Sequence, residues 1–365
     1  MTLKCGIIGL PNVGKSTLFN ALTESIAAEA ANYPFCTIEP NTGIVSVPDE
    51  RLVKLAKNAG SAKIISAFIE FVDIAGLVKG ASKGEGLGNK FLSHIREVDA
   101  IIHVLRCFED EDITHVHGKV DPIYDAEIVE AELIIADLES VEKRLVSSEK
   151  KIKSGDKTIV ETIELLKDCK IVLEQGNPVR TLSNKHSKQA LASLQLITSK
   201  PILYVCNVLE SEAIEGNNFS MQIKEKAKNE NANSVIISSK IEAEISTLES
   251  HDEKQDFLES LGLTETGLSK IIKSSYALLD LKSFFTIGPK EAHAWTFKNG
   301  AIAPQAAGII HTDFEKGFIR AEVINCTELL AIGSEVKAKE LGKLRVEGKE
   351  YIMQDGDVVH FRFNV

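Results

Sequence analysis

An apolar run leads into residues 9–16, Gly-Leu-Pro-Asn-Val-Gly-Lys-Ser, and a helical stretch through Thr23 follows. Strand, glycine-rich loop and helix in this order are the context of the phosphate-binding loop G-x-x-x-x-G-K-[ST]. The glycines let consecutive backbone N–H groups turn toward phosphate oxygens, and the helix N-terminus adds the positive end of its dipole. The feature therefore predicts a nucleotide-binding α/β domain.

Within this loop, each polar group has an expected partner on the nucleotide. We expect Lys15 to reach the β- and γ-phosphates, where it also serves catalysis, and the Ser16 hydroxyl to ligate Mg²⁺. The predicted nucleotide-binding residues of the loop are Asn12, Val13, Gly14, Lys15, Ser16 and Thr17.

Composition narrows the class of protein. The chain has 365 residues, a net charge of −11 and six cysteines without C-x-x-C spacing. Scattered cysteines argue against a zinc site or a disulfide framework, and they favour a reducing cytoplasm. The negative charge disfavours a simple basic nucleic-acid binder, and no apolar stretch reaches membrane-span length. Because the first strand begins at Leu3, we expect no signal peptide.

Apolar runs recur as buried strands before and after a helical stretch. We expect strands at residues 3–8, 43–47, 67–72, 100–105, 202–207 and 234–238. Continuous apolar runs suit a parallel sheet covered on both faces, so the prediction is a doubly wound α/β domain formed by residues 1–125 and 200–278.

Two regions differ from that pattern. Residues 126–199 carry apolar positions every three or four residues around a turn at 154–156, which predicts an inserted helical hairpin of coiled-coil type. Two ordinary sheet-covering helices are the alternative. Residues 279–365 read as a small β-rich domain, with hairpin-turn signals at 298–300 and 354–356 and an alternating strand that ends in Phe363.

Further motifs separate switch proteins from other phosphate-loop proteins. Asp73-Ile74-Ala75-Gly76 follows a strand and spells D-x-x-G, in which Asp73 holds the Mg²⁺ shell and the Gly76 N–H bonds the γ-phosphate. Between the two motifs, Thr37 is our choice for the threonine that closes over Mg²⁺, and Thr42 is the alternative. Leu77 occupies the position where many switch GTPases carry a water-orienting glutamine.

Base recognition is expected after the strand at 202–207. The stretch Asn207-Val208-Leu209-Glu210 replaces the Asn-Lys-x-Asp of guanine readers: lysine is absent and the aspartate is a longer glutamate. The predicted base-site residues are Asn207, Leu209, Glu210, Ser238 and Ser239.

Together these motifs resemble the YchF (Obg-like ATPase) family of translation-factor-class phosphate-loop proteins. The resemblance rests on residues 9–16, on Asn-Tyr-Pro-Phe-Cys-Thr-Ile-Glu-Pro-Asn at 32–41, on Asp-Ile-Ala-Gly-Leu-Val at 73–78 and on Asn-x-x-Glu at 207–210. Residues 303–322 resemble that family's TGS domain, a ubiquitin-like β-grasp. The resemblance spans the chain and implies an Obg-type nucleotide fold with a helical insertion, a preference for ATP over GTP and association with ribosomes.

The family resemblance also implies a catalytic residue. The family assigns water positioning to a histidine on a mobile loop, and His115 occupies the matching place, with His117 close by. In related K⁺-activated proteins an asparagine at the position of Asn12 helps to bind a monovalent cation, so K⁺ is an expected activator; a simple turn-forming role for Asn12 is the alternative.

The expected function is therefore a cytoplasmic, slowly hydrolysing ATPase switch. Its expected partners are ATP with Mg²⁺ and the ribosome, as large subunit or whole particle, through ribosomal RNA and protein, and no membrane. The alternatives are an Obg-type GTPase and a ribosome-binding module whose ATP site is regulatory.

Overall fold

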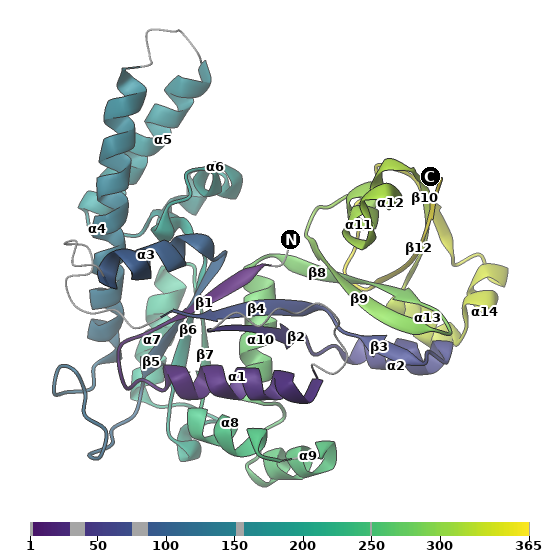
Figure 1. Ribbon diagram of the computed structural model, residues 1–365, viewed down its shortest axis with the longest axis horizontal. Helices are drawn as coiled ribbons and strands as arrows, with labels where there is room; N and C mark the ends of the chain where they lie inside the picture. The colour runs from purple at the N-terminus through teal and green to yellow at the C-terminus, as the bar shows by residue number, and fades with distance from the viewer. Residues whose placement is uncertain (1–2, 30–40, 75–86, 151–156, 249, 365) are drawn as a thin grey trace. The chain divides into compact units, whose positions relative to one another are not determined.

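The computed structural model describes residues 3–29, 41–74, 87–150, 157–248 and 250–364. The chain divides into two compact units (Figure 1): Met1–Val45 with Glu70–Ser275, and Ser46–Ile69 with Tyr276–Val365. The chain therefore leaves the first unit, returns to it and leaves it again. We describe each unit by itself.

The first unit is built on a six-stranded sheet with the order β2-β4-β1-β5-β6-β7. The strands are β1 (Lys4–Ile8), β2 (Thr42–Ser46), β4 (Phe68–Asp73), β5 (Ala100–Arg106), β6 (Ile202–Asn207) and β7 (Asn233–Ile237). The neighbours from β4 to β7 run parallel. Every residue of β5 and β6 is buried, as expected of apolar strands covered on both faces. The predicted strands are confirmed to within two residues at each end.

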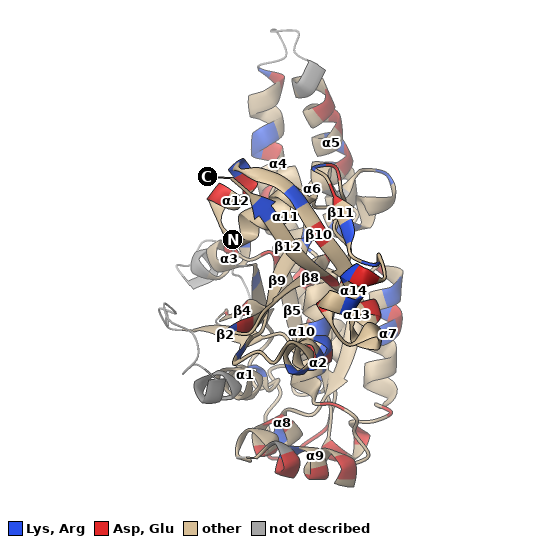
Figure 2. Ribbon diagram, turned by 90° about the vertical axis from the view of Figure 1, so that its right-hand side faces the viewer, with Lys and Arg blue, Asp and Glu red and all other residues tan. Residues whose placement is uncertain are grey.

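Helices lie on both faces of this sheet (Figure 1). They are α1 (Lys15–Glu29), α3 (Leu87–Glu97), α4 (Pro122–Glu149), α7 (Asn218–Asn229), α8 (Ser239–Ser246), α9 (His251–Ser260) and α10 (Gly267–Leu278). Helix α1 packs beside α8, whereas α4 packs against β5 and α7. Acidic residues gather along α9 (Figure 2). The doubly wound α/β architecture is as predicted.

The inserted segment forms a helical pair, α4 and α5 (Lys157–Glu174), and continues into α6 (Lys188–Ser193) and two short 3-10 helices, Val179–Asn184 and Ile197–Ser199. Asp121 caps α4 and Pro122 occupies its first turn, a favoured start signal. Buried residues of both helices, among them Val141, Leu166 and Cys169, share one apolar cluster. Helix α4 pairs with α5 and also covers β5. It therefore has features of both the predicted hairpin and the alternative, in which the helices cover the sheet. The predicted turn at 154–156 lies outside the described residues.

The second unit contains a mixed sheet of order β11-β10-β12-β8-β9-β3. Its strands are β3 (Lys63–Ile65), β8 (Leu281–Ile287), β9 (Glu291–Lys298), β10 (Phe318–Asn325), β11 (Arg345–Glu347) and β12 (Asp357–Phe363). The hairpin β8–β9 is antiparallel, and β12 lies parallel to β8. Helix α11 (Ala303–Ile310) packs on β9 and β10, as in the predicted β-grasp arrangement, and α12 (Thr312–Lys316), α13 (Cys326–Ile332) and α14 (Glu335–Glu340) follow.

The segment 46–69 departs from the predicted domain limits, which placed it in the nucleotide domain. Its helix α2 (Glu50–Ala59) packs on β8, β9 and α13, and β3 extends the second sheet as an edge strand beside β9. Arg51 contacts Asp355 at 2.7 Å between Nη1 and Oδ2. The apolar face of α2, formed by Leu52, Leu55 and Ala56, is buried there.

The two predicted hairpin turns are corrected as well. Residues 298–300 lead from β9 toward α11, and residues 354–356 precede β12, so neither joins two neighbouring strands. The hairpin turn lies between β8 and β9 instead. Asn-Gly and Asp-Gly favour a tight turn, but the chain on either side decides whether strands pair across it.

Candidate nucleotide site

The loop between β1 and α1 approaches its neighbours closely. A Cβ atom at Gly9 would lie 2.6 Å from the Val104 carbonyl oxygen, and one at Gly14 would lie 2.4 Å from Nδ2 of Asn207. Gly14 also has a φ of +92°, which side-chain-bearing residues rarely adopt. Glycine is therefore required at both ends of the loop, where the backbone passes close to its neighbours before α1 begins at Lys15.

Two predicted site residues meet beside this loop. The ammonium group of Lys15 forms an ion pair with the carboxylate of Asp73, the last residue of β4. Both side chains are largely shielded from water, at 12% and 18% exposure. Parallel pairing of β1 with β4 sets Ile7 opposite Asp73 and so brings the carboxylate to the loop.

The residues present suit a magnesium ion. Mg²⁺ prefers oxygen ligands and usually keeps several waters beside substrate phosphates. Ser16 is exposed in the first turn of α1, and Asp73 supplies a carboxylate nearby. No cluster of three or more His, Cys, Asp or Glu that could enclose a metal occurs among the described residues. The predicted Thr37 and Gly76, and also Leu77, lie outside the described residues, whereas Thr42, the alternative to Thr37, is the first residue of β2.

Asn207 ties the base side of the site together. Its buried side-chain amide donates from Nδ2 to the Val13 carbonyl at 3.0 Å and accepts at Oδ1 from the Ser239 N–H at 2.9 Å. Both ends of the amide are thus engaged within the protein. Asn207 joins β6, the phosphate-binding loop and the start of α8, and its role is to hold these elements in place.

A cavity of about 530 Å³ opens beside Asn207 and the phosphate-binding loop. Its walls include Asn12, Gly14, Thr17, Phe108, Asp110, Ile113, Asn207, Val208, Leu209, Glu210, Ser238, Ser239 and Lys240. The predicted base-site residues therefore line one cavity. Glu210 forms an ion pair with Lys240 at 2.9 Å, and the buried Ser239 hydroxyl has no partner in the described part of the chain.

Arg106 holds the wall of this cavity that Phe108, Asp110 and Ile113 form, and it was not among the predicted site residues. The guanidinium is 1% exposed at the end of β5 and donates to the carbonyls of Phe108, Asp110 and Ile113 at 3.1, 3.0 and 2.8 Å. It also lies over the Phe108 ring, 4.8 Å from its centre. An arginine that ends a largely apolar, buried strand was the available signal, because a buried cation requires acceptors.

The loop then reaches the phosphate-binding loop and α4. Asn12, with φ of +63°, donates from Nδ2 to the Thr114 carbonyl at 3.2 Å. His115 is nearly buried, and its Nε2 lies 2.9 Å from Oδ2 of Asp125, while its Nδ1 accepts from the His117 N–H at 3.2 Å. Burial raises the pKa of the Asp125 carboxyl, and the hydrogen bond from His115 opposes that rise.

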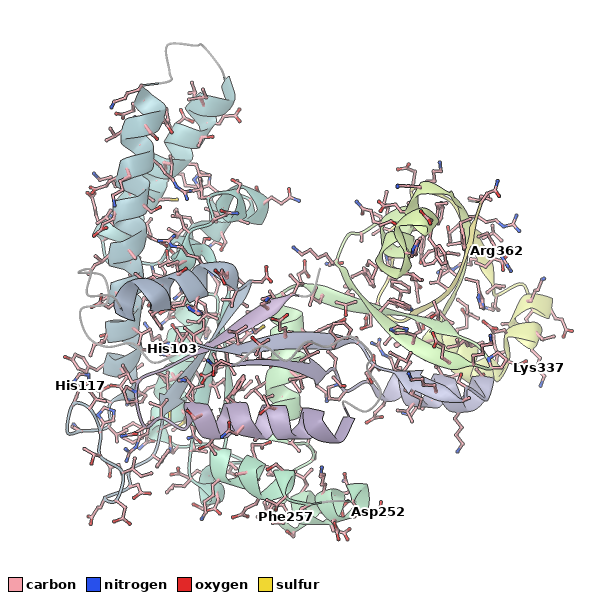
Figure 3. All side chains as sticks on the ribbon, in the orientation of Figure 1. His103, His117, Asp252, Phe257, Lys337 and Arg362 are labelled. Atoms are coloured by element: carbon pink, nitrogen blue, oxygen red, sulfur yellow. The ribbon has the colours of Figure 1, made fainter. Side chains whose placement is uncertain are left out.

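His115 and His117 are thus distinguished by their surroundings. Only His115 has a buried carboxylate partner; the His117 ring packs edge-on against Tyr124, with 5.4 Å between ring centres. His117 lies in the loop before α4, whereas His103 lies among the strands of the sheet (Figure 3). Asp125 was not predicted as a site residue, because α4 gives no local sign that one acidic position faces inward.

Comparison with known proteins agrees with the fold. Residues 4–240 match the family model described as 50S ribosome-binding GTPase, and residues 281–364 match the model YchF-GTPase_C, described as a protein of unknown function. The ribosome-binding ATPase YchF of Bacillus subtilis is 57% identical, and that of Haemophilus influenzae 52% identical, over the full length of both chains in each case.

A solved structure extends the comparison to three dimensions. The Schizosaccharomyces pombe YchF GTPase is 39% identical and superposes with a TM-score of 0.88, covering 99% of this chain and 98% of its own. These similarities cover both units of the chain, and they are high enough to assign its family. The chain belongs to the YchF family.

Proposed function

We propose that this chain is an ATP-binding molecular switch that hydrolyses ATP slowly and associates with ribosomes, as large subunit or whole particle. Its full-length relatives are named ribosome-binding ATPases. The observation that carries the nucleotide assignment is the cavity beside Asn207, because one side chain joins the phosphate-binding loop to the walls that a base would occupy.

The cavity favours adenine over guanine. Guanine readers carry an aspartate that pairs with the edge of the base, whereas the matching residue here is Glu210, a longer side chain whose carboxylate lies in an exposed ion pair with Lys240. Rejecting a base that leaves buried polar groups unpaired is worth about 1–3 kcal/mol for each group. An Obg-type GTPase is the second candidate, since the yeast relative is described as a GTPase. A binding module with a regulatory ATP site is the third, since Leu77 offers no water-orienting amide.

In the proposed mechanism Lys15 and the α1 N-terminus hold the triphosphate, and Ser16, Asp73 and Thr37 hold Mg²⁺. Bound Mg²⁺ supplies positive charge at the β- and γ-phosphate oxygens. Lys15 must leave Asp73 to reach the phosphates, so phosphate binding frees that carboxylate. Gly76 would sense the γ-phosphate through its N–H.

His115 is proposed to orient the attacking water. An imidazole that donates from Nε2 to Asp125 and accepts at Nδ1 has both nitrogens occupied. It must therefore leave these partners before it can hold water, which makes turnover conditional on movement of the loop. We also propose K⁺ as an activator beside Asn12, whose Nδ2 is already engaged by Thr114.

Two experiments test the proposal. Titration with Mg²⁺-ATP and Mg²⁺-GTP is expected to give the lower dissociation constant for ATP; equal or tighter GTP binding contradicts it. Co-sedimentation with purified ribosomes in ATP, in ADP and without nucleotide is expected to show nucleotide-dependent binding. Equal binding in all three conditions would contradict a nucleotide-dependent switch and would support a ribosome-binding module.

We further propose that residues 279–365 are a TGS domain and that, with the helical insertion 126–199, they supply contacts to ribosomal RNA and protein. The cytoplasm is the proposed location. In the part of the chain that the structure describes, no helix has the length and apolarity to cross a membrane.

A further inference from the structure

A groove away from the nucleotide site runs along α4 in the first unit. It has a volume of about 1150 Å³ and lies between α4, the end of α5 with the segment that follows it, and α7. Its lining includes apolar residues of α4 and acidic residues of all three helices. None of its lining residues belongs to the nucleotide cavity.

The groove has an apolar wall. Ile134, Ile135, Leu138 and Leu173 line it, together with the exposed Ala131. Ile134 and Leu173 belong to the buried cluster of the helical pair, whereas Ile135 is 45% exposed. The core of the hairpin therefore continues outward into a surface that water covers in the isolated chain. Exposed apolar surface rimmed by polar residues is typical of a protein-binding site.

The charges deep in the groove are balanced. Arg180 is buried and forms ion pairs with Glu130 and, at 2.8 Å, with Glu230. Lys226 contacts Glu230 at 2.6 Å, and the Tyr204 hydroxyl donates to the same carboxylate at 2.9 Å. Two cations thus match two carboxylates, and this cluster adds no net charge to the groove.

The charges at the rim are not balanced. Glu127, Glu174 and Glu225 line the groove and are exposed. Glu174 lies 3.6 Å from Lys170, a pair that is half exposed and therefore weakly coupled. No ion pair of Glu127 or Glu225 is found in the described part of the chain; Glu127 helps to raise the pKa of Lys226, whose ammonium group already pairs with Glu230. The rim is consequently acidic around an apolar wall.

We propose that this groove binds a basic amphipathic helix of a protein partner. Apolar side chains of such a helix would cover Ile135 and Leu138, and its lysines or arginines would meet the rim carboxylates. Nucleic acid is the wrong chemistry here, because phosphates would face three exposed carboxylates. The inference rests on the proposed function at one point. If the chain binds ribosomes, the partner at this groove is a ribosomal protein and not ribosomal RNA.

The sign of a charge reversal tests the proposal. In co-sedimentation with purified ribosomes, the double variant Glu127→Lys, Glu225→Lys is expected to bind about tenfold more weakly, since it loses two rim carboxylates and repels a basic helix. The matched control, Asp256→Lys with Glu259→Lys, makes the same charge change at exposed positions of α9, outside the groove and outside residues 126–199 and 279–365, and is expected to retain binding. Tighter binding of the groove variant would identify a nucleic-acid partner and overturn the proposal, as would equal losses in both variants.

A second probe makes the test independent of ribosomes. A fluorescein-labelled synthetic helix of leucine and lysine, with leucine on one face, is titrated with the full chain and followed by anisotropy. Ile135→Ser is expected to weaken peptide binding several-fold while Mg²⁺-ATP binding and thermal unfolding stay as in the wild type, which shows an intact fold. Unchanged peptide affinity in both Ile135→Ser and the double charge reversal would refute the groove. Wild-type chain that binds the peptide but not ribosomes would refute the proposed function alone.

Discussion

The two units satisfy their buried polar groups in different ways. In the first unit the buried Asn207 and Asp137 bond groups that lie 32 to 194 residues away in the sequence, whereas in the second the buried Asp357 bonds Gln354 and Tyr351, three and six residues away. Among the described residues, the buried side-chain nitrogen and oxygen atoms without a partner all lie in the first unit: His103, Asp125, Arg180, Ser239 and Ser275.

This difference indicates that the first unit can change its hydrogen bonds with ligand or state, whereas those of the second unit stay fixed. An unpartnered buried polar atom costs free energy, and such atoms persist where a ligand or a change of state can satisfy them. Two of these five residues lie at the candidate site. Ser239 lines the cavity, and Asp125 is the hydrogen-bond partner of His115. The second unit instead packs aromatic rings, with Phe284 beside Trp295, Phe297 and Phe361. We therefore expect site substitutions to perturb the first unit selectively.

The largest expected effect follows from removing the Arg106 guanidinium. Arg106→Met removes three charged hydrogen bonds to loop carbonyls and is expected to lower the free energy of unfolding of the first unit by about 3 kcal/mol. Far-UV circular dichroism in denaturant measures this loss. Trp295, the single tryptophan, reports the second unit by fluorescence, and its transition is expected to stay in place. An equal shift of the denaturant transition of Trp295 would contradict the expected difference between the two units.

The next effect concerns catalysis. His115→Ala is expected to lower the single-turnover rate of ATP cleavage about a hundredfold with ATP affinity retained, because water positioning of this kind contributes on that scale. His117→Ala is the matched control, since its ring packs on Tyr124 and lacks a carboxylate partner. Measurements in K⁺ and in Na⁺ also test the proposed cation. A larger loss in His117→Ala would reassign the catalytic role.

Acid sensitivity provides a smaller, unit-specific effect. Burial lowers the pKa of His103 to about 3 and that of His293 to about 4, so the unfolded chain binds these protons first as pH falls below about 6.5. Each histidine therefore costs stability as pH falls, by about 2 kcal/mol between pH 6.5 and 5 at 1.4 kcal/mol per unit. His103→Phe is expected to remove this loss from the first unit only. Denaturant unfolding at the two pH values measures it, and an unchanged pH slope contradicts the assignment.

The smallest effect tests where the segment 46–69 belongs. Arg51→Ala removes the contact with Asp355 and is expected to destabilise the second unit by about 0.5–1 kcal/mol, a modest value because both side chains are more than a third exposed. Hydrogen exchange should speed up in β8 and β12 and stay unchanged in β5 and β6. Lys54→Ala, which removes an exposed pair with Glu50 on the same helix, is the control.

Local pattern predicted most of the first sheet and a set of residues that line one cavity. The strands and the helical pair follow from apolar patterning, and α1 follows from the phosphate-binding motif. The cavity gathers Asn207, Leu209, Glu210, Ser238 and Ser239 because parallel strands end at one edge. The resemblance named the family before the comparisons confirmed it.

What the sequence did not predict depends on contacts that form only when the chain is folded. Helix α2 is amphipathic whichever sheet it covers, so its pattern cannot choose the second unit. Arg106 and Asp125 acquire meaning only once the loop and α4 fold around them. Asn-Gly at 299–300 favours a turn, but pairing across it requires a following strand, and α11 follows instead.

Because the chain passes between the units at residues 45–46, 69–70 and 275–276, the second unit is not a detachable tail. A chain cut after Leu278 would keep α2 and β3 but lose the strands and helix that they pack on, leaving Leu52, Leu55 and Ala56 open to water and β3 with a bare edge. Truncation would therefore yield an aggregation-prone fragment rather than an isolated nucleotide domain. The first two crossings fall at the end of β2 and inside β4, so domain swaps or grafts in this family must exchange residues 46–69 together with the C-terminal part.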